Sequence, residues 1–465
     1  MPTTDRANVH AVFKAYDVRG TVPDQLDEEL ARRTGAAFVA VAGASTVVVG
    51  HDMRPSSPSL AAAFGEGVAA AGADVVMIGL ASTDELYFAS GSLGHPGAMF
   101  TASHNPAAYN GIKLCRAGAR PVGADTGLHA IRDAVSGPPP VAAAVRGAVW
   151  QRDVLGAYAD HLVGLAPVAG RRLKVVVDAG NGMAGLTAPT VLGRLDAGPG
   201  GGVELVPMYF ELDGTFPHHE ANPIDPVNLV DLQSRVLVEG ADLGLAFDGD
   251  ADRCFVVDER GRAVSPSTLT ALIAARELER EPGATVIHNL ITSRFVPQLV
   301  TDLGGTPVRT RVGHSFIKTT MAQTDAVFGG EHSGHFYFRD FWRADSGMLA
   351  ALHTLAALAA TEAPLSQLLA DYERYVASGE VNSEVGDPAA AQATVETAYA
   401  DVPGVELDRL DGLTVTAATW WFNLRASNTE PLLRLNVEGD DEATMTRVRD
   451  DVLALIQSSP KEAAE

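Results

Sequence analysis

Three stretches of this chain repeat one pattern, in which an apolar, β-rich run leads into a polar or glycine turn and then into a helical segment. They begin with VVVGHDMR (Val47–Arg54), VVVDAGNG (Val175–Gly182) and TVIHNLITSR (Thr285–Arg294). Strands that alternate with helices are typical of layered α/β domains with parallel or mixed sheets. The sequence therefore predicts three related α/β domains with mixed sheets, arranged in series.

The last part of the chain has a different character. LTVTAATWWFNLRASN alternates apolar and polar residues as a strand does, and DDEATMTRVRDDVLALIQ has the period of an amphipathic helix. These segments indicate a smaller C-terminal α+β domain. The Pro- and Gly-rich stretch Val135–Gly147 indicates the first boundary. We expect four domains around a central cleft, with bounds 1–148, 149–255, 256–370 and 371–465.

The charge of the chain excludes some classes of partner. The 465 residues carry a net charge of −23, and an acidic surface gains nothing from nucleic acid or an anionic membrane. No apolar run approaches the roughly 20 residues that cross a bilayer, and the N-terminal residues have no signal-peptide core. Cys115 and Cys254 have neither disulfide nor metal spacing. We expect a reduced, cytoplasmic protein, monomeric or homodimeric, without nucleic-acid or membrane partners.

Lysine is rare in this chain, because only five of the 35 basic residues are lysines. They are Lys14, Lys113, Lys174, Lys318 and Lys461. An arginine fork cannot replace a compact, titratable ammonium group. Each retained lysine therefore hints at a specific need.

FTASHNPAAYNGIK (Phe100–Lys113) places a serine, a histidine and an asparagine before a proline. The residue before proline avoids the helical region, so this run cannot continue a helix. An apolar stretch precedes it, and we expect a strand that ends in a tight, polar, exposed turn. Such turns on a rigid sheet often carry chemistry, although a capping serine is the more ordinary explanation.

LAFDGDADRCFVVDERG carries Asp248, Asp250 and Asp252 at alternate positions, followed by Arg253. Carboxylates this close repel one another unless a cation gathers them, and an oxygen-only set suits Mg²⁺ or Ca²⁺. An EF-hand loop is disfavoured, because Arg253 stands where the sharp turn needs glycine and an apolar strand follows. Three carboxylates leave room on Mg²⁺ for phosphate oxygens and water.

Other segments are ambiguous in isolation. GGEHSGHFYF offers Glu331 and Ser333 to ligand hydroxyls, while its histidines lack a further ligand for a metal site. RASNTEPLLRLNVEG combines arginines, hydroxyls and backbone N–H groups, as phosphate sites do. FKAYDVRG and VGHSFIK add basic residues. GNGMAG matches a dinucleotide fingerprint, but no strand ending in an acidic residue follows at the expected distance, so we interpret it as a strand-to-helix turn.

Taken together and in this order, the motifs resemble those of the α-D-phosphohexomutase family. The matches are TASHNP, DGDADR, GEHSGH and RASNTEP, one for each expected domain. The resemblance covers nearly the whole chain. It implies that Ser103 carries a phosphoryl group, and that Mg²⁺ is held by Asp248, Asp250, Asp252 and an oxygen of phosphorylated Ser103.

The resemblance also implies a reaction and roles for the other residues. A hexose phosphate would pass through a hexose 1,6-bisphosphate, which also serves as activator, so that phosphate moves between C1 and C6. The residues that would face the transferring phosphoryl group are Arg19 and Arg253. The candidates for proton transfer, among which the sequence does not choose, are Lys113, His104 and His314. The hydroxyl readers would be Glu331 and Ser333. The phosphate anchor would consist of Arg425, Ser427, Asn428, Thr429 and Arg434.

Within the family, TASHNPAAYNGIK and GEHSGH look most like phosphomannomutases of the actinobacterial type. This implies interconversion of mannose 6-phosphate and mannose 1-phosphate, with glucose phosphates as second substrates, for GDP-mannose and glycan synthesis. Two positions depart from the family pattern: Ile291 stands where a basic residue is usual, with Arg294 out of register, and His332 replaces methionine or leucine. Phosphoglucosamine mutase, a metal-dependent sugar phosphatase and a non-catalytic sugar-phosphate sensor stay open as alternatives.

Overall fold

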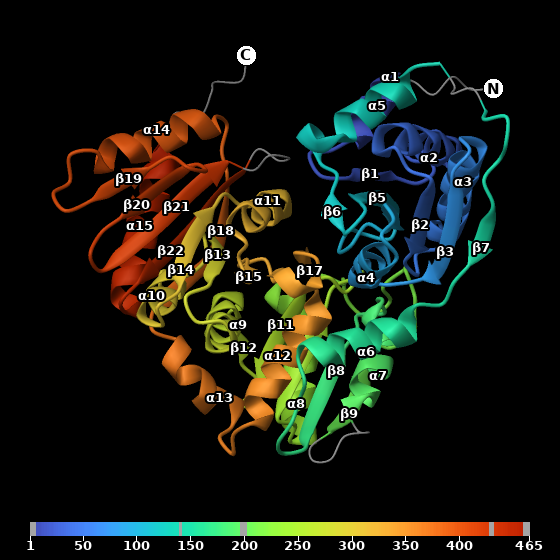
Figure 1. Ribbon diagram of the computed structural model, residues 1–465. Helices are drawn as coiled ribbons and strands as arrows, with labels where there is room; N and C mark the ends of the chain where they lie inside the picture. The colour runs from blue at the N-terminus through green and yellow to red at the C-terminus, as the bar shows by residue number, and fades with distance from the viewer. Residues whose placement is uncertain (1–5, 139–141, 196–201, 427–431, 459–465) are drawn as a thin grey trace.

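The computed structural model describes residues 6–138, 142–195, 202–426 and 432–458. Within these residues the chain forms four sheets, which follow one another along the sequence and around an arc (Figure 1). The first three sheets are mixed and the fourth is antiparallel. The predicted series of three α/β domains and a smaller C-terminal α+β domain is confirmed.

The first domain has a sheet in the order β1-β5-β4-β2-β3-β7, with β6 beside β5. Its elements are α1 (Arg6–Val12), β1 (Val18–Thr21), α2 (Glu28–Ala42), β2 (Thr46–His51), α3 (Ser57–Ala70), β3 (Asp74–Leu80), α4 (Thr83–Leu93), β4 (Gly97–Phe100), β5 (Tyr109–Arg116), β6 (Arg120–Pro121), α5 (Leu128–Ser136) and β7 (Val149–Gln151). Helix α4 begins with a cap in which Ser82 Oγ accepts a hydrogen bond from the backbone N–H of Glu85. This cap fixes the end of α4 that points toward the second domain.

The second domain has the strand order β12-β11-β10-β8-β9. Its elements are α6 (Leu155–Leu165), β8 (Leu173–Asp178), α7 (Ala184–Gly193), β9 (Val203–Met208), α8 (Val230–Glu239), β10 (Leu243–Phe247), β11 (Cys254–Asp258) and β12 (Ala263–Val264). The GNGMAG stretch is the turn between β8 and α7, as predicted. A Cβ on Gly182 would lie 2.7 Å from the carbonyl oxygen of Gly249, so this glycine permits a close approach to the loop after β10.

The third domain has the strand order β14-β13-β15-β16-β17. Its elements are α9 (Pro266–Arg280), β13 (Thr285–Asn289), α10 (Phe295–Asp302), β14 (Thr306–Thr310), α11 (His314–Thr324), β15 (Phe328–Gly330), β16 (Phe336–Phe338), β17 (Ala344–Asp345), α12 (Gly347–Ala359) and α13 (Leu365–Leu368). Short 3₁₀ turns in the first three domains lie at Ala124–Thr126, Pro226–Leu229, Arg339–Phe341 and Leu369–Tyr372.

The expected domain bounds can be compared with the sheets. Strand β7 joins the first sheet beyond residue 148, and β11 and β12 extend the second sheet beyond residue 255. The domain bounds stay predictions.

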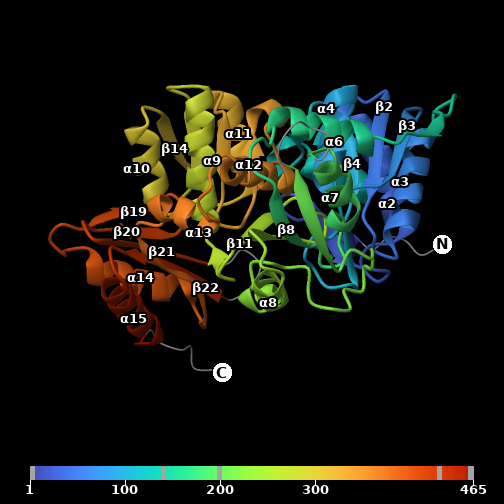
Figure 2. The same ribbon diagram turned by 90° about the horizontal axis from the view of Figure 1, so that it is seen from below.

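The fourth domain has the order β18-β22-β21-β20-β19. Its elements are β18 (Val376–Glu384), α14 (Pro388–Tyr399), β19 (Glu406–Asp408), β20 (Leu413–Thr416), β21 (Trp420–Ala426), β22 (Leu432–Gly439) and α15 (Glu442–Ser458). Helices α14 and α15 cover one face of this sheet (Figure 2). The predicted closing helix is confirmed as α15. None of the helices within the described ranges is long and apolar enough to cross a membrane.

The first three domains place a loop at the same point of their sheets. In each, a strand with a parallel neighbour turns into an antiparallel partner: β4 into β5, β10 into β11, and β15 into β16. These three turns contain the serine, acidic and GEHSGH segments of the sequence. A buried apolar cluster extends through all three domains, whereas the fourth domain has a separate core. The three loops are therefore held in a common frame.

Candidate active site

The serine loop (Thr101–Ala108) holds Ser103 in an uncommon conformation. Ser103 has a φ of 49°, and a non-glycine residue adopts this left-handed region only where its surroundings impose it. Its backbone N–H donates a 2.9 Å hydrogen bond to Thr101 Oγ1. Only 6% of Ser103 is exposed, so the prediction of an exposed turn is wrong at this residue. The acidic loop of the second domain covers it, since a Cβ on Gly249 would lie 2.4 Å from the Ser103 carbonyl oxygen.

Arg54 holds the serine loop in place through hydrogen bonds to its backbone. The sequence analysis did not identify this residue. The side chain is fully buried, and its guanidinium Nε lies 3.2 Å from Asp52 Oδ2. The guanidinium also donates hydrogen bonds of 2.6–3.0 Å to backbone carbonyls of the serine loop and its end, at Ser103, Asn105, Pro106 and Tyr109. An Asp and an Arg two residues apart, directly after a buried strand, were the available signal in VVVGHDMR.

The acidic loop (Asp248–Arg253) connects β10 to β11 and brings three buried carboxylates together. One oxygen from each of Asp248, Asp250 and Asp252 lies within 4.8 Å of the others. Asp250 Oδ1 and Asp252 Oδ1 are buried without a hydrogen-bond partner. Three buried carboxylates gathered in this way, two of them with an unpartnered oxygen, fit a cation of the Mg²⁺ type. Strand β11 follows directly, which contradicts an EF-hand loop.

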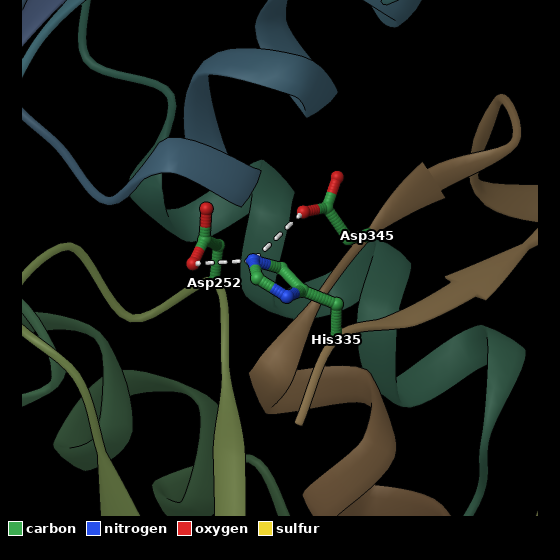
Figure 3. A group of neighbouring side chains, drawn as sticks. All are labelled: Asp252, His335 and Asp345. Atoms are coloured by element: carbon green, nitrogen blue, oxygen red, sulfur yellow. Dashed lines mark ion pairs between the residues drawn. The ribbon is translucent and has the colours of Figure 1, made fainter. Parts of the chain in front are cut away.

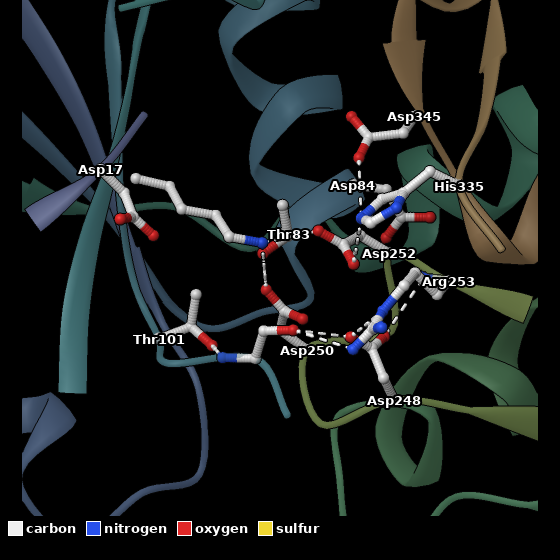
Figure 4. A network of polar contacts seen from close by, with 12 residues as sticks. Asp17, Thr83, Asp84, Thr101, Asp248, Asp250, Asp252, Arg253, His335 and Asp345 are labelled. Atoms are coloured by element: carbon white, nitrogen blue, oxygen red, sulfur yellow. Dashed lines mark hydrogen bonds and ion pairs between the residues drawn. The ribbon is translucent and has the colours of Figure 1, made fainter. Parts of the chain in front are cut away.

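The serine and acidic loops meet directly (Figure 4). Ser103 Oγ donates a 2.7 Å hydrogen bond to Asp248 Oδ2. Arg253 completes this contact, because its Nε donates to the same Asp248 oxygen at 2.9 Å and its Nη2 lies 3.4 Å from Ser103 Oγ. Two loops that are 145 residues apart in the sequence thus place a hydroxyl, a carboxylate and a guanidinium at one point.

Lys113 bridges the other two carboxylates. Its Nζ lies 2.7 Å from Asp250 Oδ2 and 2.6 Å from Asp252 Oδ2. Burial opposes the ammonium charge, but the two carboxylates hold the pKa of Lys113 well above its usual value. Thr83, at the start of α4, donates a 2.5 Å hydrogen bond to Asp250 Oδ2. The ammonium group of Lys113 between Asp250 and Asp252 shows that these two carboxylates attract a positive charge.

Asp248 lacks such an ammonium partner. Burial raises the pKa of its carboxyl to about 7; Arg253 opposes this shift, and the neighbouring carboxylates add to it. Burial also acts on Asp250 and Asp252, yet Lys113 keeps the pKa of both carboxyls below the usual value. The loop is therefore electrostatically uneven, with one carboxyl that protonates readily and two that do not.

Arg19 and His104 both contact the serine loop. Arg19 Nη1 donates to the Ala102 carbonyl at 3.0 Å and also to Asn105 Oδ1, while Nη2 pairs with Asp17. His104 is exposed, and its Nδ1 lies 3.1 Å from Ser103 Oγ. His314 is the first residue of α11, and its side chain lies outside the described part of the structure.

The glutamate loop (Glu331–His335) contains the predicted hydroxyl readers. Glu331 is buried, and its carboxylate accepts hydrogen bonds from Tyr337 at 2.6 Å, from Asn289 at 3.3 Å and from the Gly313 N–H at 3.2 Å. Ser333 Oγ lies 3.0 Å from Nδ1 of His335. These contacts fix the two side chains within the third domain.

His335 reaches the acidic loop, which the sequence analysis missed. Its Nε2 lies 3.6 Å from Asp252 Oδ1 and 4.0 Å from Asp345 Oδ2 (Figure 3). The expectation that no further carboxylate accompanies the histidines of GGEHSGH is wrong. Nothing in the sequence indicated that His335 would meet these carboxylates, because Asp252 belongs to another domain and Asp345 lies on a later strand of the sheet.

The predicted phosphate anchor is only partly described. Arg425 Nη2 lies 3.3 Å from Glu380 Oε2, and Arg434 Nη1 lies 3.2 Å from Glu380 Oε1. Glu380, on β18, was not anticipated. Ser427, Asn428 and Thr429 lie outside the described residues. Among the described side chains, the structure gathers Ser103, Lys113, Arg253 and the three aspartates tightly, while the two arginines form a separate group.

A cavity of about 440 Å³ lies beside the glutamate loop, between the third and fourth domains. Ile291 and His332, the two positions that depart from the family pattern, both line it, together with Asn436. Ser267 Oγ lies 3.4 Å from His332 Nδ1. Arg294 is turned toward the fourth domain, where Nη1 donates to the Ala418 carbonyl at 3.2 Å.

Comparison with known proteins agrees with this architecture. Residues 10–137, 156–261 and 265–375 match phosphoglucomutase/phosphomannomutase alpha/beta/alpha domains I, II and III, and residues 380–455 match the C-terminal domain of the same family. A phosphomannomutase of Salmonella typhimurium is 44% identical over 442 residues, covering 94% of this chain and 96% of the relative. Phosphohexose mutases of Xanthomonas campestris are 43% identical, covering 94% of this chain and 97% of the relative.

A solved structure supports the same assignment. The crystal structure of a phosphoglucomutase/phosphomannomutase family protein from Burkholderia thailandensis superimposes with a TM-score of 0.87 at 33% identity, covering 98% of both chains. The resemblance deduced from the four loops is thereby confirmed. The chain belongs to the phosphoglucomutase/phosphomannomutase family of mutases.

Proposed function

We propose that this enzyme interconverts mannose 6-phosphate and mannose 1-phosphate, with glucose 6-phosphate and glucose 1-phosphate as second substrates. The observation that carries the proposal is the 2.7 Å contact between Ser103 Oγ and Asp248, with Arg253 beside both. It joins a nucleophilic hydroxyl to a cation-binding loop, which phosphoryl transfer requires. The names of the relatives support mannose phosphates as substrates.

In the proposed reaction, Ser103 carries a phosphoryl group at rest. Transfer breaks the bond from phosphorus to Ser103 Oγ and forms a bond from phosphorus to a sugar hydroxyl, whose proton passes to a basic side chain. The product is a hexose 1,6-bisphosphate, which reverses its orientation and returns the other phosphoryl group to Ser103. Added bisphosphate would restore phosphoserine that is lost to water, and thus act as an activator.

The chain's own charges support this transfer. Arg253 lies beside Ser103 Oγ and Arg19 binds the serine loop at Ala102 and Asn105, and both would neutralise charge on the transferring group. Asp248, Asp250, Asp252 and a phosphoserine oxygen would hold Mg²⁺, and the unpartnered oxygens of Asp250 and Asp252 fit this assignment. Bound there, the ion supplies charge neutralisation for the transferring phosphoryl group.

Proton transfer has several candidates. Lys113 and His335 lie against the acidic loop, and His104 lies against Ser103 Oγ. His314 belongs to the same proposed set. A group that transfers a proton must reach the sugar hydroxyl beside Ser103 in both orientations of the substrate.

The distant phosphate of the substrate would bind Arg425 and Arg434, with Ser427, Asn428 and Thr429 completing the anchor. Glu331 and Ser333 would read sugar hydroxyls. The cavity lined by Ile291 and His332 adjoins the loop that carries both readers. We propose that preference between mannose and glucose is decided there. A cytoplasmic enzyme without nucleic-acid or membrane partners, monomeric or homodimeric and supplying GDP-mannose synthesis, is consistent with this activity.

The test is kcat/KM for mannose 1-phosphate and glucose 1-phosphate, measured side by side with Mg²⁺ and a trace of hexose 1,6-bisphosphate. Ser103→Ala serves as the inactive control. A mannose preference of at least about tenfold, or comparable values for both sugars, supports the proposal. Turnover of glucosamine phosphate alone would indicate a phosphoglucosamine mutase. Phosphate release without isomer exchange would indicate a phosphatase, and binding without either reaction would indicate a sensor.

A further inference from the structure

The function proposed above leaves one buried lysine without a role. Lys318 lies on α11 with 3% of its side chain exposed, and its Nζ lies 2.6 Å from Asp345 Oδ1. The ammonium also faces two aromatic rings, at 4.2 Å from the ring centroid of Tyr87 and 5.8 Å from that of Tyr337. Cation–π contacts of this kind strengthen when the charge is desolvated. Lys318 is thus held from three directions.

The second oxygen of Asp345 faces His335. His335 Nε2 lies 4.0 Å from Asp345 Oδ2 and 3.6 Å from Asp252 Oδ1 (Figure 3). Both distances exceed that of a hydrogen bond, so the two carboxylates orient the imidazole by charge. On the other side of the ring, Nδ1 meets Ser333 Oγ at 3.0 Å. Glu331 Oε2 also lies 3.9 Å from Nδ1. Ser333 and Glu331 on one edge of the ring and two carboxylates on the other edge therefore define its direction.

Each of the two carboxylates that face His335, Asp252 and Asp345, pairs with a lysine through its other oxygen. Lys113 holds Asp252 through Oδ2 at 2.6 Å, and Lys318 holds Asp345 through Oδ1 at 2.6 Å. In both cases the remaining oxygen is the one that faces His335. A buried carboxylate without its ammonium would turn toward any other donor. The two lysines therefore decide which oxygens the imidazole meets.

We infer that Lys318 is a positioning residue, which acts through Asp345 to keep Nε2 of His335 directed at the acidic loop. The inference rests on the proposed function, because it assigns His335 to the phosphoryl-transfer site. Lys318 does not touch the proposed site of Ser103 in the described contacts. Its effect on turnover must therefore pass through the imidazole.

The surroundings explain why this residue is a lysine in a chain that prefers arginine. Tyr87 belongs to the first domain, while Tyr337 and Asp345 belong to the third, so the ammonium lies where two domains pack. A planar guanidinium is wider than an ammonium and would not fit the same space between a ring and a carboxylate. Helix α4 carries both Tyr87, which faces Lys318, and Thr83, which donates a hydrogen bond to Asp250 of the acidic loop.

The rival explanation is that Lys318 only stabilises the fold. Removing Lys318 alone would leave the buried carboxylate of Asp345 without its ammonium partner, and breaking a buried ion pair from one side destabilises proteins strongly. The variant K318M/D345N removes both charges at nearly constant volume and avoids this effect. Combining it with H335Q gives a mutant cycle, in which residues that act as one unit show strongly non-additive effects.

We expect K318M/D345N to lower kcat for mannose 1-phosphate by about 10- to 100-fold, the usual cost of losing an outer partner of a site residue, with KM changed less than about threefold. In the H335Q background the same pair should change kcat by less than about twofold. K174M is the matched control, because Lys174 pairs with Glu239 at 2.9 Å away from the site; its kcat should stay within about twofold of the parent protein. An equal loss in both backgrounds would overturn the inference.

An NMR measurement tests the contact independently of turnover. The imidazole ¹⁵N signals of His335 are assigned by their absence in H335Q. They should move in K318M/D345N and stay in place in K174M. Unmoved signals in a folded K318M/D345N protein would overturn the inference even if kcat falls. Absence of mutase turnover in the parent protein, with moved signals, would instead contradict the proposed function and leave the positioning contact established.

Discussion

The two ends of the proposed substrate site differ in how their charges are held. At the serine end, Asp248, Asp250 and Asp252 are buried, and the buried Arg253 and the partly buried Lys113, which come from two domains, neutralise them. At the anchor end, Arg425 and Arg434 both pair with Glu380, whose side chain is 25% exposed. The serine end is built into the common core of three domains, and the anchor end belongs to a domain with its own core.

This difference indicates a division of work. Buried charges with fixed partners cannot reorganise cheaply, so they suit the end where charge develops during transfer. The ion pairs of the anchor end are partly exposed, and solvent weakens such pairs, so they contribute less and exchange partners more easily. The anchor end therefore suits repeated capture and release of whichever phosphate is not reacting.

Ser103→Ala should reduce mutase turnover by about a thousandfold or more, because it removes the group that carries the phosphoryl. The melting temperature should change little, since the loop is held mainly by Arg54 and the backbone. Intact mass should show one extra phosphoryl group on the parent protein and none on the variant. Ser92→Ala is the control, because Ser92 lies on α4 outside the site. Near-normal turnover in Ser103→Ala would contradict the assignment of Ser103.

Asp250→Asn should lower turnover by about 100-fold and weaken Mg²⁺ binding together with it, because the site loses one of its charged oxygens. Calorimetric titration with Mg²⁺ measures the binding. Asp160→Asn is the matched control, since Asp160 pairs with Arg194 at an exposed position. If Mg²⁺ affinity is the same in both variants, Asp250 is not a ligand, and the serine end is not organised around a cation.

The serine end was also the more predictable of the two from sequence. Its residues cluster within short motifs that follow strands, so DGDADR and TASHNP could be recognised directly. The contacts of Arg54, His335 and Lys318 could not be predicted in this way, because their partners come from other parts of the chain. Arg54 binds carbonyls of the serine loop, and His335 meets Asp252 across a domain boundary. The VVVGHDMR segment and the rarity of lysine marked Arg54 and Lys318 without identifying their partners. Burial of Ser103 was missed for the same reason, since a loop of the next domain covers it.

The fold was predictable where the sequence repeats the pattern of an apolar strand, a turn and a helix. The strands beginning near Val47, Val175 and Thr285 appear as β2, β8 and β13, each followed by a helix. The shared position of the functional loops, between a parallel strand and an antiparallel one, was not predictable. Strand pairing depends on contacts between distant segments, which no local pattern specifies.

The acidic loop should show a pH effect that the anchor end lacks. Because the pKa of Asp248 is raised to about 7 in the metal-free protein, this carboxyl must lose a proton before it can bind Mg²⁺. Affinity for Mg²⁺ should therefore fall as pH drops below 7, by up to about tenfold per unit. Calorimetry at pH 6 in two buffers with different ionisation enthalpies should detect release of about one proton, and at pH 8 almost none.

Sulfate is the comparison ligand for the anchor end, because it keeps its charge over this range and arginine does not titrate. Its affinity should be the same at pH 6 and pH 8. Mg²⁺ binding that is independent of pH would mean that Asp248 is already ionised, and that Arg253 neutralises it as completely as Lys113 neutralises the other two carboxylates.

The smallest expected effect concerns Glu380, and its sign decides how the anchor works. A phosphate that binds Arg425 and Arg434 must displace this carboxylate, and partly exposed ion pairs contribute about 0.2–1 kcal/mol each. Glu380→Gln should therefore lower KM for the sugar phosphate by about two- to fivefold and leave kcat unchanged. Glu384→Gln, at an exposed position of the same strand, should change neither. A higher KM in Glu380→Gln would mean that the carboxylate aligns the two arginines, in which case the anchor end is preorganised like the serine end and the contrast between them fails.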